Sequence, residues 1–321
     1  MKGSTIGAGT TGSGHTLAPL RGHNGRNIAS PPPASTMVPL YTGAIFQVAD
    51  WHCTGHDDGN HREEWCDAHE VAVTRRGVYS REVGRMHIVA DPSTVVFWND
   101  AEAYRIRHPV PGGDDCSIFR FRQGAFREFI ASLAPRLSDA ETLHFPVAQC
   151  SLQGRTYLTH RSAVVAAQAL AYGAQEDPLA VEELGLAFLQ DVVGFTPRRA
   201  VSNRHAREYA NRVRIVIGAR FKESLSLTQI GESVECSPYH LTRVVRQALG
   251  TSIHQLLVRL RLRAALEQLV STTAGISPIA FDVGFASHSH FSHAFRREFG
   301  ATPTAVRRAM ARRGSRALPG R

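Results

Sequence analysis

Two absences limit what this chain can be. It contains no run of about 18 apolar residues, the length that a helix needs to cross a membrane, so we expect no membrane-spanning segment and no membrane partner. Residues 1–5 (MKGST) do not lead into the apolar stretch of a secretory signal, so we expect a cytoplasmic protein. Hydrophobic residues still make up 43% of the 321 residues, which is enough for two domains that each bury a core.

Cysteine is scarce and follows no motif. The chain has five cysteines, an odd number, and none of them forms a Cys-x-x-Cys pair. Because a chain without a secretory signal does not normally rely on a disulfide framework, we expect free thiols. The five are Cys53, Cys66, Cys116, Cys150 and Cys236.

Acidic residues are few in the last third of the chain. Residues 205–321 hold 18 Lys and Arg against 7 Asp and Glu, a net charge of +11, whereas the rest of the chain carries −2. The whole positive excess therefore lies in one segment. This is the electrostatic footprint of a nucleic-acid-binding domain, although a solvated basic face would give the same count.

The pattern of the chain predicts a multidomain α+β protein. Its start is rich in Gly, Ser, Thr and Pro and is predicted to be disordered. Short alternating runs follow, such as Val71 with Val73 and Met86 with Ile88, and they predict a small antiparallel β barrel or a double-sheet roll. The predicted segments are a disordered tail at 1–35, a cupin-like barrel at 36–135, a helical segment and linker at 136–204, an all-α domain at 205–312 and a basic tail at 313–321.

Two helices are predicted between the barrel and the basic domain. One is the alanine-rich stretch 160–174, and the other spans 179–193. Such a pair forms either an oligomerisation unit or an ordinary packing layer, and the pattern does not separate the two. Residues 194–202 begin with a glycine and contain Pro197, so they are predicted to be an interdomain linker.

The first of two helix-turn-helix patterns covers residues 227–246. Thr228 is predicted to cap its first helix. Ser237 followed by Pro238 predicts the start of its second helix, since Ser is a good N-cap and Pro suits the first helical position. Gly250 predicts the end of that helix. The side of this helix that faces away from its apolar stripe carries Tyr239, Thr242, Arg243 and Arg246.

The second pattern covers residues 279–300 and repeats this logic. Ser277 with Pro278 is predicted to cap its first helix, and Gly284 to adopt a positive φ in the turn. Ser287 is predicted to cap the second helix. The exposed side of that helix is predicted to carry Ser289, His290, His293, Arg296 and Arg297.

A single amphipathic helix over about 253–269 is predicted to join the two patterns. Leucines form its apolar side, and Arg259, Arg261 and Arg263 are expected to decorate its surface. A stiff helix of this length fixes the spacing of the two outer helices, ideally close to one DNA turn of about 34 Å. Two such helices can enter successive segments of one major groove, which predicts a sequence-specific DNA-binding protein.

Many residues of both patterns are shared with one known family. They are Ser237, His240, Leu241, Gly250, Arg261, Leu262, Ala265, Ile279, Ala280, Val283, Gly284, Phe285, Ser287, Phe291, Phe295, Phe299, Gly300, Thr302 and Pro303. Through them, residues 208–310 closely resemble the DNA-binding domain of the AraC/XylS family of transcription regulators. The resemblance implies a seven-helix domain that binds asymmetric sites, often as an activator that contacts RNA polymerase.

The resemblance also implies which side chains read bases. Two residues depart from the family pattern: Val245 stands where a core aromatic is usual, and His293 stands where many members have Arg. A mostly neutral imidazole discriminates bases less strongly than a bidentate Arg does. Phosphate is the main competing contact for Arg243 and Arg246. The implied base-reading residues are Tyr239, Thr242, Arg243, Ser289, His290 and His293.

The N-terminal half gives weaker signals. Turn and strand residues between Gly77 and Cys116 resemble cupin-like sensor domains, which implies a barrel that responds to an unknown small-molecule effector or forms a homodimer. Cys53, Cys66, His69 and Cys116 could supply four ligands to Zn²⁺. Because no standard zinc spacing occurs, no metal site is predicted, and metal or thiol-redox sensing stays an alternative.

Catalytic motifs are missing as well. The chain has no nucleophile elbow, no phosphate-binding glycine loop and no His-Glu-x-x-His motif. Its single His-x-His, at His288 and His290, lies in the DNA-reading pattern, so a cupin-type enzyme fused to a DNA-binding segment is the weaker alternative. We predict no enzyme and no cofactor, and instead a transcription regulator, an activator, with promoter DNA and RNA polymerase as partners.

Overall fold

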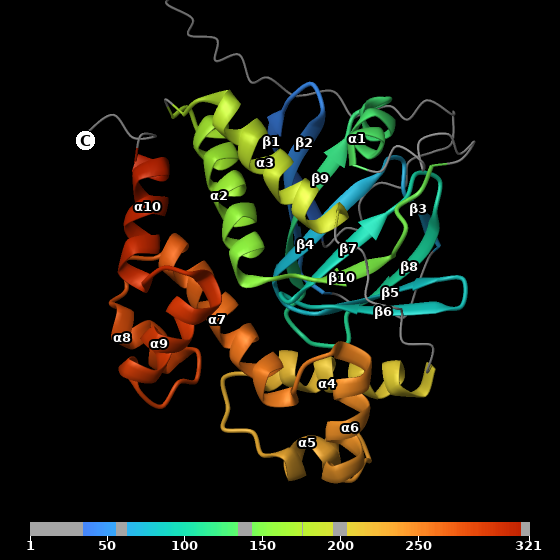
Figure 1. Cartoon of the computed structure of the whole chain (residues 1–321), viewed down its shortest axis with the longest axis vertical. Helices are drawn as coiled ribbons and strands as arrows, with labels where there is room; N and C mark the ends of the chain where they lie inside the picture. Colours follow the sequence, from blue (N-terminus) through green and yellow to red (C-terminus); the bar gives the residue numbers. More distant parts are fainter. Residues whose placement is uncertain (1–34, 56–62, 134–142, 175, 195–203, 316–321) are drawn as a thin grey trace, which may run out of the picture.

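The computed structural model places most of the chain in secondary structure (Figure 1). The predicted tail before Ser35, the predicted linker after Gly194 and the end of the basic tail after Ser315 lie outside the residues that it describes. No helix among the described residues is both long and apolar enough to span a bilayer. The described residues are 35–55, 63–133, 143–174, 176–194 and 204–315.

The first part of the structure is an antiparallel β domain, as predicted, and its described residues form ten strands. They are β1 (Ser35–Thr42), β2 (Phe46–Cys53), β3 (Glu64–Trp65), β4 (Glu70–Arg76), β5 (Tyr79–Val83), β6 (Met86–Ala90), β7 (Thr94–Trp98), β8 (Ala103–Arg107), β9 (Asp114–Phe121) and β10 (Gln149–Ser151). They form two antiparallel sheets, with the strand orders β1-β2-β9-β4-β7-β10 and β3-β8-β5-β6. The predicted helical segment at 136–204 therefore also contributes one strand, β10, which pairs with β7.

The six-stranded sheet is covered on both faces. Along β7, Val95 and Phe97 pack into the core that the sheet shares with the helices, and Val96 packs toward the four-stranded sheet. The same holds for β4, where Val71 and Val73 are flanked by residues that are also buried. The polar neighbours Glu70 and Thr74 are therefore buried as well, because a strand covered on both faces has no solvated side.

Three helices cover the outer face of the six-stranded sheet: α1 (Ala125–Leu133), α2 (Gly154–Ala171) and α3 (Pro178–Val193). Helices α2 and α3 lie side by side in Figure 1. Phe188 and Ala163 are fully buried there. Within this chain the pair thus forms a packing layer, which is one of the two roles that the sequence left open.

Seven helices form residues 204–315, in agreement with the resemblance. They are α4 (Arg204–Arg220), α5 (Leu227–Ser233), α6 (Pro238–Leu249), α7 (Ile253–Ser271), α8 (Ile276–Asp282), α9 (His288–Phe299) and α10 (Pro303–Ser315). Helices α4 to α6 and the start of α7 enclose one core. Helices α8 to α10 and the end of α7 enclose a second, and its apolar residues are continuous with those of the sheet and of α2 and α3.

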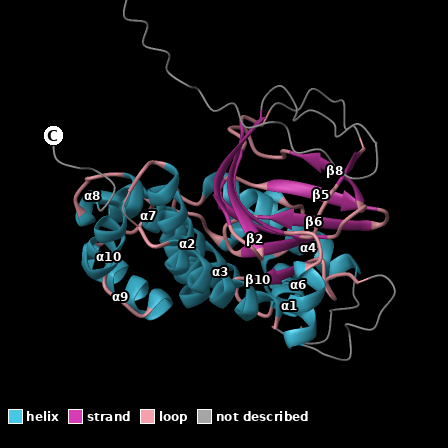
Figure 2. Cartoon of the chain, turned by 90° about the horizontal axis from the view of Figure 1, so that it is seen from above, coloured by secondary structure: helices cyan, strands magenta, loops and turns pink. Residues whose placement is uncertain are grey.

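Figure 2 shows the strands at one end of the molecule and α8 to α10 at the other, with α2 and α3 between them. Helix α2 contacts α9 and α10, and α4 contacts β6. The packing therefore crosses the predicted boundary near residue 204. The two helix-turn-helix units therefore pack against the N-terminal half, in addition to being joined to it through the chain.

Candidate nucleic-acid interface

Helix α5 opens the first helix-turn-helix unit. Its N-cap is Ser226, whose side chain accepts a hydrogen bond from the backbone of Gln229, while the Gln229 side chain accepts one from the Ser226 backbone. This capping box satisfies two free N–H groups at once. The prediction that Thr228 caps the helix is wrong, because Thr228 lies inside the first turn.

Helix α6 follows as predicted. Ser237 caps it, Pro238 is its first residue, and Gly250 ends it in the left-handed region with a φ of 66°. Leu241, Val244 and Val245 form its buried side. The lighter Val245 is fully buried in the first core, so the departure from the family pattern is accommodated there.

The opposite side of α6 carries the four predicted side chains, and all are exposed. Tyr239 is 90% exposed, which no packing requirement explains. The Arg243 guanidinium lies 3.2 Å from Nδ1 of His240, and the Thr242 hydroxyl donates to the Tyr239 carbonyl. Within the described part of the chain, no carboxylate pairs with Arg243 or Arg246. Both cations are therefore available to an anionic partner.

Helix α8 opens the second unit two residues earlier than predicted. It begins at Ile276 after Gly275, so Pro278 is the third helical residue and Ser277 is not the cap. The backbone N–H groups of the first helical turn have no carbonyl acceptor within the helix. A proline, which lacks an N–H group, therefore breaks no hydrogen bond there. In the turn, Gly284 has a φ of 93°, as predicted. A Cβ at Gly284 would lie 2.7 Å from the Lys222 carbonyl oxygen, so only glycine fits.

Helix α9 has the same pattern of caps and buried residues as α6. Ser287 caps it, as predicted, and Phe291, Phe295 and Phe299 form its buried side. Its outer side is open to solvent, and no carboxylate pairs with the two arginines there within the described residues. The exposed residues are Ser289, His290, His293, Arg296 and Arg297.

Helix α7 joins the two units and fixes their separation. Its 19 residues correspond to about 28 Å. In Figure 1 the α5–α6 pair lies near one end of α7 and the α8–α9 pair near the other. Lys222 also reaches across from the end of α4 to Asp282 of α8, with Nζ 3.0 Å from the carboxylate.

The arginines of α7 do not all decorate its surface, which corrects the sequence-based expectation. Arg261 donates to the carbonyls of Phe221 and Glu223 and so holds the loop before α5 against α7. Arg263 is fully buried and donates to the Leu152 carbonyl at 2.7 Å. Arg261 and Arg263 thus stabilise the packing around α7 through these hydrogen bonds. Arg259 and Arg261 stay partly exposed, and only Arg263 of the three is buried.

The four cysteine and histidine candidates of the N-terminal half do not come together. Cys53 and Cys116 lie near Asp114, at the start of β9. Cys66 and His69 belong to the segment beside the end of β9, where the His69 carbonyl accepts from the backbone of Phe121. Five residues of strand, about 17 Å, separate Cys116 from Phe121. The four candidate ligands therefore do not form a single metal site.

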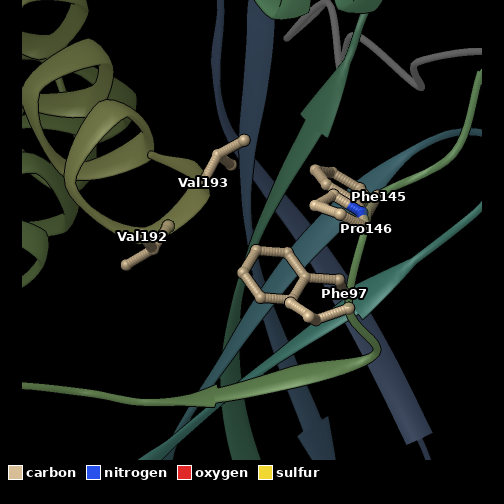
Figure 3. Close-up of a pocket in the computed structure, with 6 residues that line it drawn as sticks. Phe97, Phe145, Pro146, Val192 and Val193 are labelled. Carbon is tan, nitrogen blue, oxygen red and sulfur yellow. The ribbon is translucent and has the colours of Figure 1, made fainter. Parts of the chain in front are cut away.

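Two hollows lie beside α3. A narrow crevice between the sheet and α3 has no space for a water molecule; Figure 3 shows Phe97, Phe145, Pro146, Val192 and Val193 around it. A second, open cavity of about 230 Å³ lies between β10, α2 and α3. Its volume is below the usual 300 Å³ or so of drug-sized sites, so it suits only a small ligand. Polar groups reach it from Ser151, Gln153, Thr156 and Asp191.

Comparison with known proteins adds independent information. Residues 230–309 match a family model described as a helix-turn-helix domain. The chain is 27% identical over 251 residues to the HTH-type transcriptional activator RhaS of Escherichia fergusonii, an alignment that covers 75% of this chain and 85% of the relative. It is 38% identical over 84 residues to the HTH-type transcriptional regulator GlxA of Rhizobium meliloti, covering 26% of each chain.

A solved structure from Chromobacterium violaceum, described as a transcriptional regulator with an AraC-type DNA-binding domain, is 31% identical. That alignment covers 37% of this chain and 100% of the other, with a TM-score of 0.32. Besides RhaS, the chain spans less than half the length of the next curated relatives that it matches, with 42%, 26% and 47% covered.

Proposed function

Since this chain belongs to the AraC/XylS family of transcription regulators, we propose that it binds promoter DNA through α6 and α9 and activates transcription. The proposal rests on the solvent exposure of the nine predicted DNA-binding side chains. All are exposed on two helices that a single braced helix, α7, holds apart. The four arginines among them have no carboxylate partner within the described residues, so they can pair with the phosphates of DNA.

The binding energy is proposed to come from two sources. Arg246, Arg296 and Arg297 contact phosphates, which gives affinity for any DNA and makes binding fall with rising salt. The side chains nearer the start of each helix reach base edges and supply sequence specificity. Helix α7, about 28 Å long, holds α6 and α9 apart. Their separation is proposed to match one DNA turn of about 34 Å, which would let both helices use one face of the duplex.

The N-terminal half is proposed to regulate this binding, through a small molecule or through dimerisation. The open cavity beside α3 supports the first route, because it lies where α2 and β10 meet and α2 also contacts α9 and α10. A ligand there would act on the layer on which the second unit rests. Activation, through contact with RNA polymerase, is proposed because the relative RhaS is a transcriptional activator.

A thiol-redox sensor is not favoured. Burial raises the pKa of the Cys66 and Cys116 thiols well above their ordinary value, and burial raises the pKa of Cys150 to about 12. Because the thiolate is the reactive form, these thiols are poor redox sensors at neutral pH.

The test is selection of DNA by the full chain from a pool of random duplexes. We expect enrichment of one asymmetric site with two conserved segments whose centres lie about 10 base pairs apart. Selected sites should then map next to genes whose expression falls when the protein is deleted. Enrichment of a single segment would contradict the use of both helices, and no enrichment would contradict the proposal.

A further inference from the structure

The two sheets bring three metal-ligating side chains together at one end of the β domain. The register of β2 and β9 places Cys53 directly opposite Asp114. His108 comes from the other sheet, one residue after β8. The Cys53 sulfur, a His108 ring nitrogen and an Asp114 oxygen all lie within 4.8 Å of one another. The sequence spacing of these three residues matches no known zinc motif.

This cluster is shielded from solvent. Cys53 is 5% exposed, Asp114 is 2% exposed, and the side chain of His108 is 11% exposed. The backbone around it is closely packed, since a Cβ at Gly113 would lie only 1.8 Å from the Cys53 carbonyl oxygen. The end of β2 and the start of β9 are therefore held in contact, which fixes the separation of Cys53 and Asp114.

We propose that Cys53, His108 and Asp114 bind a divalent, thiophilic cation, with Zn²⁺ as the best match. One sulfur, one imidazole nitrogen and one carboxylate oxygen are ligands that Zn²⁺ accepts, whereas Mg²⁺ and Ca²⁺ disfavour sulfur. In a tetrahedral site with bonds of about 2.0–2.3 Å, neighbouring ligand atoms are about 3.3–3.8 Å apart. The three ligand atoms, all within 4.8 Å of one another, would have to move closer by up to about 1.5 Å to reach this geometry.

Cys116 has a supporting role in this site. Its thiol lies on the same side of β9 as Asp114 and donates to the second Asp114 oxygen at 3.1 Å. A hydrogen bond of this kind orients a carboxylate ligand without occupying the metal. Three protein ligands leave the fourth position of a tetrahedral site to water or to another small ligand.

An ion pair between His108 and Asp114, whose nearest atoms are 2.6 Å apart, is the alternative explanation of the cluster. Cys53 also takes part in it, since its side chain hydrogen-bonds His108. The two explanations differ in a measurable way, because only a metal site binds Co²⁺ or Zn²⁺ through the Cys53 sulfur. The inference does not depend on DNA binding and can fail or hold separately from it.

The experiment uses the full chain, purified without a histidine tag and stripped with a chelator. One equivalent of Co²⁺ is added as a spectroscopic probe, and Zn²⁺ is then added in competition. We expect a thiolate-to-cobalt charge-transfer band that saturates at one equivalent and disappears when Zn²⁺ displaces the probe. Native mass spectrometry should show one zinc ion per chain.

Variants assign the ligands. Cys53→Ser and Asp114→Asn should lose the band, whereas Cys66→Ser, a matched loss of a buried thiol elsewhere in the domain, and Cys116→Ser should keep it. Cys53→His should still bind one zinc ion but without the charge-transfer band, which separates loss of a ligand from loss of the fold. Stoichiometric binding that is absent in the wild type, or unchanged in Cys53→Ser, would overturn the proposal.

Discussion

Single residues of α6 differ in what they can contribute to DNA binding. Arg243 lies one turn from the N-terminus of α6, near Tyr239, while Arg246 lies in its last turn. If Arg243 reads a base, Arg243→Ala should weaken binding to the selected site by about 1–3 kcal/mol and leave binding to random DNA almost unchanged. Fluorescence anisotropy against both duplexes measures the two affinities.

The matched control is Arg220→Ala, which removes an exposed arginine of α4 that already pairs with Glu223. It should leave both affinities unchanged. An equal loss on both duplexes in Arg243→Ala would instead assign Arg243 to a phosphate.

His160 predicts a pH dependence of stability. Burial, and then the nearby charges of Arg161, Arg75 and Arg263, lower its pKa well below 6.5. As the pH falls below about 6.5, the unfolded chain binds a proton that the folded chain does not, so stability decreases toward acid. The slope can reach about 1.4 kcal/mol per pH unit for one such group.

Urea unfolding between pH 7 and pH 5 measures this slope. His160→Leu should flatten it, because the leucine has no proton to exclude, while His87→Gln, at an exposed position, should follow the wild type. A His160→Leu variant with the wild-type slope would show that other groups cause the dependence.

At the scale of elements, two residues near the start of α5, Ser226 and Thr228, can be compared as N-caps. Ser226→Ala removes the capping box and should destabilise the protein by about 1 kcal/mol. Thr228→Ala, two residues later, should have little effect, since its exposed side chain caps nothing. Denaturant unfolding of both variants gives the comparison, and a larger loss in Thr228→Ala would contradict the assigned cap.

Helix ends were predictable where the signal is local. Ser237 with Pro238, Gly250 and Ser287 mark real boundaries, because a cap acts on backbone groups within three or four residues. Ser277 with Pro278 gave the same signal and was wrong, because α8 begins two residues earlier, at Ile276 after Gly275. Local patterns do not determine which of two nearby starts the packing favours.

At the scale of the whole molecule, a buried ion pair ties α4 to the β domain. Nη1 of Arg214 lies 2.5 Å from the Asp91 carboxylate and 2.7 Å from the Thr94 hydroxyl. Arg214→Leu would leave the fully buried Asp91 without its cation, so we expect a loss of about 3–5 kcal/mol and earlier proteolysis between the two halves.

Arg212→Ala is the control for that experiment. Arg212 is two residues away on the same helix, and its partner Glu235 is exposed, so we expect a loss below about 1 kcal/mol. Equal effects of the two substitutions would mean that the buried pair does not hold the halves together. The predicted domain boundaries at residues 135, 204 and 312 stay predictions. The hydrophobic core includes residues on both sides of residue 204.

The sequence by itself determined the DNA-binding half, because each helix there has its own apolar stripe, caps and turn glycines, and these act over a few residues. It also determined that an antiparallel β domain precedes this half. Only the tertiary structure decided which distant side chains meet. Strand register placed Cys53 and Cys116 beside Asp114 and kept Cys66 and His69 away. It also buried Arg263, whose spacing on α7 had indicated a surface position, because α2 covers that side of the helix. Contacts between residues more than a hundred positions apart leave no periodic signal in one sequence.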